Sequence, residues 1–453
     1  MSIHPLPPRT ENDSSVETSA SAANEQRAAK LFSFGSIFLP LRNRNFSLLF
    51  SGQLVSNIGD GLYYVALPWF MLSGGGGVQA LGIVLGAFGV ARVVGALLGG
   101  PLTNMLRPRR VMLMADSVRV VLMAALTLLV LAGHPALWVL CLLSALLGLF
   151  GGMFLPASMS VAPSILHEDE LQAGNSLTSS SAQLASAAGL GIAGVVVAWL
   201  KPAGTLGLDA ATFLISAGAL FFMRDMLSAK SANAATSEGN AGTKSETMVP
   251  PLTFGQLLRR SHILQTILLL FVCVSLGTGA MFEVALPVLL HDQLHASASS
   301  YGFILAGFSV GAIIGSLAAG GLGKIPYRLG LSMVCFLIEA ALLILLPLMG
   351  NVTIGVLIML VAGVLNGLIV VTAMAILQGQ IPTHLLGSVM GLLAVANFGL
   401  YPISVGIAGV LVPRFGSVPV FLAGGLLLAL PALVGCLQPN FWQRGDVKLM
   451  GQK

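Results

Sequence analysis

Charged side chains inside apolar segments are the strongest chemical signal in this sequence. Asp60, Arg92 and Glu283 each interrupt a long apolar stretch, and stretches of about 20 apolar residues are the length that spans a bilayer. An ionisable group in hydrocarbon costs at least about 2.5–3.5 kcal/mol, so it marks a candidate site for handling ions or solutes. These three residues are therefore the first candidates for proton coupling and substrate contact.

Asp60 and Arg92 are expected to lie at the same depth. Asp60 is about fourteen residues into its apolar segment, roughly 20 Å along a helix. Arg92 is equally far into the next segment, which runs in the opposite direction. The two side chains could form an ion pair that faces a cavity. Alternatively, the pair only holds two helices together, because a buried ion pair is weak evidence for anything more.

Glu283 has no cation at an obvious matching depth in its half of the chain. A buried carboxylate without a cation favours its protonated form, which suits a group that takes up and releases a proton. The alternative is a protonated glutamate that bonds a backbone carbonyl and has no role in transport. Glu339, midway through a later segment, is a second and weaker candidate.

Further polar residues are expected to line a cavity or to close it. Asn57, Tyr63, Asn366 and Asn397 are candidates for the cavity wall, although most such residues in a helix bundle bond neighbouring helices. Asp116 and Arg119 are three residues apart and share a helix face.

Together with Asn104, Arg109 and Arg110, the pair of Asp116 and Arg119 predicts a cytoplasmic gate. Interfacial snorkelling of these side chains is the alternative.

The elements that carry these residues are membrane spans. Of the 453 residues, 56% are hydrophobic and only 9% are charged, against roughly 25% charged residues in soluble domains. We expect an all-α, polytopic fold with 12 transmembrane helices. Their approximate ranges are 47–72, 78–103, 111–132, 136–157, 177–200, 205–224, 263–290, 300–323, 329–349, 352–377, 387–412 and 417–437.

The sequence also repeats itself within these spans. GDG (59–61) followed by VALP (65–68) reappears as GTG (277–279) followed by VALP (284–287), and Glu283 lies in a one-residue insertion between the second pair. A chain of two equivalent halves places a site between them, and rocking the halves opens that site to each side in turn. The repeat therefore predicts two six-helix halves of a transporter, with span one facing span seven.

The positive charges predict how the chain is oriented. Of the 22 Lys and Arg, 18 are expected on the side that holds both termini, and the four exceptions are Arg92, Arg119, Lys201 and Arg414. The positive-inside rule puts that side in the cytoplasm. The basic pI near 9.2 is thus an orientation signal, and we expect membrane lipid as a partner and no nucleic acid.

Composition divides the chain into five parts. We expect a disordered cytoplasmic N-terminus (1–30), an N-terminal half (31–228), a cytoplasmic linker (229–250), a C-terminal half (251–438) and a cytoplasmic tail (439–453).

The sequence has no Walker-type phosphate loop, no metal-type His/Cys spacing and no Ser-His-Asp arrangement. We therefore expect no cofactor, no metal and no enzymatic activity.

Several stretches resemble the major facilitator superfamily, in particular its branch of drug and siderophore exporters that includes macrolide and enterobactin exporters. The resemblance is carried by LRNRNF (41–46), GQLVS (52–56), GDG (59–61), GGPLTNMLRPRRVMLMADSVR (99–119) and AGNS (173–176). The chain departs from the family pattern at Asn104-Met105, where Asp-Arg is usual, and at Gly189-Leu190, where the antiporter motif has Gly-Pro. The second change removes a helix-bending proline.

The resemblance implies a proton-coupled exporter of a lipophilic or amphiphilic small molecule. It implies a multi-pass, monomeric protein of the bacterial inner membrane that works by alternating access. Direction rests on the resemblance alone, so a lipid flippase or an importer on the same scaffold stays open. A membrane-embedded sensor or enzyme is the alternative from another class, and the internal repeat argues against it.

Overall fold

The computed structural model describes residues 38–223, 262–321, 328–380, 393 and 399–438, except residues 75, 134 and 167. No strand occurs in these ranges, and nine helical stretches within them are long and apolar enough to cross a membrane. The prediction of an all-α, polytopic fold is confirmed, and the count of 12 spans stays a prediction. The expected terminal segments 1–30 and 439–453 and the linker 229–250 lie outside the described residues.

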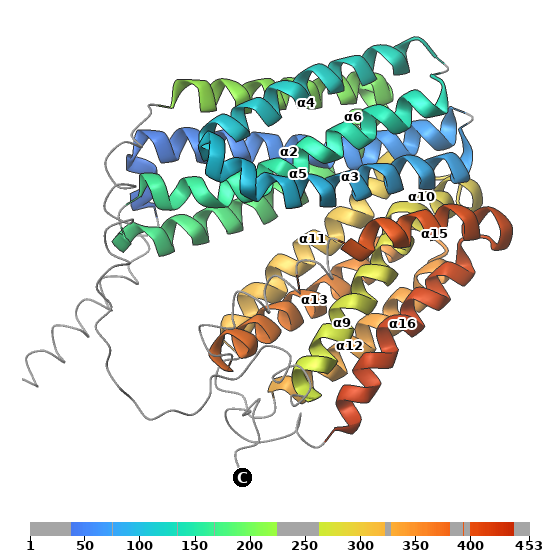
Figure 1. Cartoon of the computed structure of the whole chain (residues 1–453). Helices are drawn as coiled ribbons and strands as arrows, with labels where there is room; N and C mark the ends of the chain where they lie inside the picture. The colour runs from blue at the N-terminus through green and yellow to red at the C-terminus, as the bar shows by residue number, and fades with distance from the viewer. Residues whose placement is uncertain are drawn as a thin grey trace, which may run out of the picture.

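The helices form two bundles, one above the other in Figure 1. The N-terminal bundle comprises α2 (Arg44–Ser73), α3 (Gly77–Leu106), α4 (Pro108–Leu131), α5 (Leu137–Ile165) and α6 (Glu168–Phe222). The C-terminal bundle comprises α9 (His262–Gly279), η2 (Ala280–Ala285), α10 (Leu286–Val288), η3 (Leu289–Gln293), α11 (Ala298–Gly321), α12 (Arg328–Leu345), α13 (Val352–Gln380), α15 (Leu400–Phe415) and α16 (Val418–Leu437).

Local sequence sets where these helices begin and break. The side chain of Asn43 caps α2 by accepting hydrogen bonds from the backbone of Asn45 and Phe46, at 3.0 and 3.4 Å, as expected for a residue favoured at helix starts. Two predicted spans, 177–200 and 205–224, are joined in α6, whose backbone is non-helical at Lys201 (φ 60°). Pro202 follows directly, and a proline cannot supply the hydrogen bond that would continue the first stretch.

Small residues bring the helices close together. The sequence places glycines four residues apart, as at Gly148/Gly152 and Gly311/Gly315, and such spacings predict close helix crossings. At the crossing of α3 and α5, a Cβ added to Gly152 would overlap the backbone of Arg92. At the equivalent crossing of α11 and α13, a Cβ on Gly315 would overlap the backbone of Val364. Backbones approach this closely only where no side chain stands between them.

The two bundles are joined at the end where α2 finishes and α3 starts. There α3 packs against α15 and α6 against α11. Gly82 meets Gly409 backbone to backbone, and the hydroxyl of Ser299 donates to the carbonyl of Gly194 at 3.1 Å. Span one also contacts span seven, since α2 touches η2 and α10, and this part of the prediction is confirmed.

Candidate functional site

An ion-pair network links three helices of the N-terminal bundle. Arg119 on α4 donates to Asp60 on α2 at 2.6 Å and to Asp116, one turn earlier on α4, at 3.4 Å. The hydroxyl of Ser216 on α6 donates to the other oxygen of Asp116 at 2.6 Å. The guanidinium also stacks on the ring of Phe213, 3.7 Å from its centre. One cation thus connects two carboxylates, of which Asp116 is fully buried and Asp60 is 38% exposed.

Asp60 therefore pairs with Arg119 and not, as expected, with Arg92. The guanidinium of Arg92 instead donates to the hydroxyl of Tyr64 at 2.8 Å. Matched depth along two antiparallel helices does not say which way a side chain points around its helix axis. Here α2 and α4 both pack on α6, which leaves Arg119 between them and facing Asp60.

The predicted gate residues do not form one cluster. Asp116 and Arg119 belong to the network around Asp60. Arg109, at the other end of the group, donates to the backbone carbonyls of Leu220 and Phe221 at 2.9 and 2.8 Å and so binds the C-terminal end of α6. Arg110 is exposed. The backbone of Asn104 belongs to α3, and its side chain lies outside the described part of the structure.

A cavity of about 530 Å³ opens beside the network. Asn57, Asp60 and Tyr63 from α2 line it together with Arg92 from α3 and Arg119 from α4. Its remaining described walls are mostly apolar and come from α2 to α6. The expected site lay between the two halves, whereas every described residue that lines this cavity belongs to the N-terminal half.

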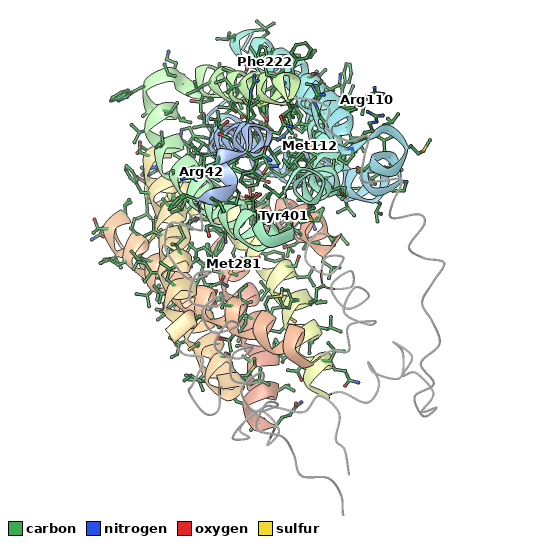
Figure 2. All side chains as sticks on the ribbon, turned by 90° about the vertical axis from the view of Figure 1, so that its left-hand side faces the viewer. Arg42, Arg110, Met112, Phe222, Met281 and Tyr401 are labelled. Carbon is green, nitrogen blue, oxygen red and sulfur yellow. The ribbon has the colours of Figure 1, made fainter. Side chains whose placement is uncertain are left out.

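Glu283 lies in a π-helical turn, η2, between α9 and α10. The hydroxyl of Tyr401 on α15 donates to one carboxylate oxygen of Glu283 at 2.6 Å, and the other oxygen is buried without a hydrogen-bond partner among the described residues. Figure 2 shows Tyr401 where the two bundles meet. A π turn holds one extra residue, so it accommodates the one-residue insertion of the second repeat. Such turns occur frequently at functional sites.

Only some of the residues predicted to form the cavity wall lie at the cavity. Asn57 and Tyr63 line the cavity, and the hydroxyl of Tyr63 bonds that of Ser144 at 3.4 Å. Asn366 instead donates to Glu339 at 3.0 Å, within the C-terminal bundle. Asn397 lies outside the described residues.

Sequence reasoning missed Asp209, a carboxylate in the second stretch of α6. It is fully buried, one of its oxygens accepts from Thr212 at 3.1 Å, and the other has no hydrogen-bond partner within the described ranges. A Cβ on Gly59, the neighbour of Asp60, would overlap both Asp209 and Thr212. The rule that selected Asp60, a charge inside an apolar span, would also have found Asp209.

In the described part of the chain, no three His, Cys, Asp or Glu side chains are grouped to hold a metal ion.

Comparison with known proteins identifies relatives among transporters. The chain is 24% identical over 400 residues to the multidrug efflux pump Tap of Mycolicibacterium fortuitum, covering 87% of this chain and 95% of that protein. It is 26% identical over 353 residues to the enterobactin exporter EntS of Escherichia coli O1:K1, covering 78% and 81%.

A third relative is matched over less of its length. The MFS-type transporter YvqJ of Bacillus subtilis is 23% identical over 271 residues, 60% of this chain and 63% of that protein. Among solved structures, the nucleoside transporter NupG superimposes with a TM-score of 0.66 at 14% identity, covering 86% of this chain and 98% of that one. This structural likeness shows a shared fold.

The chain also matches a family as a whole. The sequence profile of the Major Facilitator Superfamily matches residues 49–405, a range that includes the ion-pair network, the cavity and the π turn with Glu283. This range is well over half of the 453 residues. The chain therefore belongs to the Major Facilitator Superfamily, a family of transporters and not of enzymes.

Proposed function

We propose that this protein is a proton-coupled exporter that moves a lipophilic or amphiphilic small molecule out of a bacterial cytoplasm. The observation that carries the proposal is the cavity of the N-terminal half, where ionisable side chains meet aromatic and aliphatic walls inside apolar helices. Charged groups at membrane depth commonly mark substrate or proton pathways. Two relatives are a multidrug efflux pump and an enterobactin exporter, which supports efflux as the direction.

Asp60, Arg92 and Glu283 form the proposed group that couples protons and faces the substrate. Asp60 lines the cavity and forms an ion pair with Arg119. Protonation of Asp60 would therefore release Arg119 toward Asp116. Glu283 lies where the two halves meet, bound to Tyr401 of a different helix. Proton binding at either carboxylate would change a contact between helices, which is what coupling to a conformational change requires.

Asn57 and Tyr63 are assigned to the substrate wall, and Asn397 remains a proposed member of it. The bond between Asn366 and Glu339 favours a structural role for Asn366. Arg109, bound to the end of α6, is the proposed gate residue, with Arg110 and Asn104 beside it in the sequence.

Alternating access is supported by the way the halves meet. If the excess of Lys and Arg puts both termini in the cytoplasm, the joined end near Gly82 and Gly409 faces outward and the cavity extends toward the cytoplasmic end. This arrangement corresponds to an inward-facing state. Rocking of the halves would then separate the contacts of α3 with α15 and of α6 with α11.

The decisive experiment is solute flux in everted membrane vesicles with an imposed pH gradient. Vesicles from cells that lack their own efflux pumps should accumulate a fluorescent amphiphile when the gradient is formed and lose it when a protonophore is added. Accumulation that is unchanged after the protonophore is added would refute proton coupling. Movement in the opposite direction would refute export, and an absence of flux over a broad panel of compounds would refute transport by this chain alone.

A further inference from the structure

We infer that Arg92 binds an anionic group of the substrate, and that the transported class is amphiphilic organic anions with an aromatic or aliphatic body. The inference rests on the proposed transport function and narrows its substrate. It follows from the way in which the charges around the cavity are already paired.

Arg92 is a cation that faces the cavity and forms no ion pair with a carboxylate of the described residues. Its guanidinium makes one hydrogen bond, to the neutral hydroxyl of Tyr64 at 2.8 Å, and no Asp or Glu of the described ranges lies within ion-pair distance of it. Its other nitrogens are not among the buried, unsatisfied atoms of these ranges. Arginine stays charged in proteins and presents its N–H groups in a planar fork that fits carboxylates, sulfonates and phosphates.

The carboxylates around Arg92 are bound elsewhere. Asp60 pairs with Arg119 at 2.6 Å, and Glu283, across the boundary between the halves, accepts from Tyr401 at 2.6 Å. Deeper in the bundle, Asp116 accepts from Ser216 and Asp209 accepts from Thr212. Arg92 is thus a cavity-lining cation that forms no ion pair with the described residues, although Asp60 and Glu283 are near enough to interact with it electrostatically.

Aromatic rings surround this charge and predict the body of the ligand. The ring of Phe88 lies 5.4 Å from that of Tyr63 and 6.3 Å from that of Tyr64, the partner of Arg92. All three side chains line the cavity, as does Phe154 on α5. A volume of about 530 Å³ falls within the range of sites for drug-sized molecules. The arrangement fits a ring system with one acidic group at its edge.

A cationic ligand fits the same cavity less well. It would have to compete with Arg119 for Asp60 and would be repelled by Arg92, and such a mismatch is a common source of specificity. Export of an anion also agrees with the membrane potential, because a negative charge that leaves a cell with a negative interior moves down the electrical gradient.

Binding to the purified protein in nanodiscs of neutral lipid tests this inference. The probes share one ring system and differ in charge: 2-naphthylacetate, 2-naphthylacetamide and 2-(2-naphthyl)ethylamine, each measured by equilibrium dialysis. The acetate should bind at least about tenfold more tightly than the other two, as expected for a hydrogen-bonded ion pair. Arg92→Gln should remove the preference for the acetate over the amide, and a single monodisperse peak of the variant in size-exclusion chromatography shows that it is folded.

Two further variants keep the test specific. Arg92→Lys should retain part of the preference for the acetate, and Arg414→Gln, which removes an exposed arginine at the end of α15, should change nothing. The inference is overturned if the amine binds most tightly, if Arg92→Gln keeps the preference, or if the parent binds none of the three probes.

Flux of the same probes in proteoliposomes separates this inference from the proposed function. Binding of the acetate without any flux would refute transport and leave the anion site intact. Transport of the amine in preference to the acetate would refute the substrate class and leave transport intact.

Discussion

Replacing Arg119 should destabilise the N-terminal bundle through its two carboxylates. Two opposite charges with centres about 4 Å apart attract by about 4 kcal/mol at an effective dielectric constant near 20. Asp60 is 38% exposed, so water compensates part of this attraction. We therefore expect a coupling free energy between Asp60 and Arg119 of about 1.5–3 kcal/mol, and a larger total loss for Arg119→Gln because Asp116 is left buried without its cation.

A double-mutant cycle measures this coupling. Asp60→Asn, Arg119→Gln and the double variant are compared by their free energies of unfolding in mixed detergent micelles. The matched control is the cycle of Asp60→Asn with Arg110→Gln, whose effects should add to within about 0.5 kcal/mol because Arg110 is exposed and forms no ion pair with the described residues. Additive effects for Asp60 with Arg119, or strong coupling for Asp60 with Arg110, would refute the ion-pair network around Arg119.

Three further predictions concern other elements. Glu283→Gln should keep ligand binding and abolish the response of vesicle flux to a pH gradient, since the amide imitates the protonated state; a response equal to that of the parent would make Glu283 structural. Gly152→Ala should cost about 1–3 kcal/mol, because the added methyl overlaps the backbone of α3. Gly100→Ala, where no described atom outside the helix's own backbone lies within 4 Å of the added carbon, should be neutral or stabilising when unfolding is measured in parallel. Arg109→Ala should cost about 1–3 kcal/mol by releasing the last carbonyls of α6. Arg110→Ala, at an exposed position, should change stability by less than about 0.5 kcal/mol.

Much of the fold can be predicted from sequence patterns that the hydrocarbon core of a bilayer requires of membrane spans. Apolar length predicts the spans, and the repeat predicts that spans one and seven meet, as α2 and η2 do. The glycine spacings predict the tight crossings at Gly152 and Gly315. These features depend only on the spacing of residues along the chain, and this spacing can be read directly from the sequence.

The site was harder to predict because it depends on rotation around helix axes. Depth alone put Arg92 beside Asp60, and the packing of α2 and α4 on α6 put Arg119 there instead. Likewise, Asn366 turns toward Glu339 and not toward the cavity of the N-terminal half. Which face of a helix a side chain occupies depends on neighbours that are distant in sequence, and no local pattern reports them.

The π turn at Glu283 lets the protein carry an extra residue without shifting the next turns of the helix. An insertion into a plain α-helix would rotate every later side chain by about 100°. Here VALP (284–287) is as buried as its counterpart VALP (65–68) in the first half, so the helix is back in phase at these residues, before a second π turn, η3, begins at Leu289. A carboxylate can therefore be added to this helix, or deleted from it, as a single-residue event that keeps the packing of VALP unchanged. The chemical difference between two otherwise equivalent halves requires no rebuilding of the scaffold.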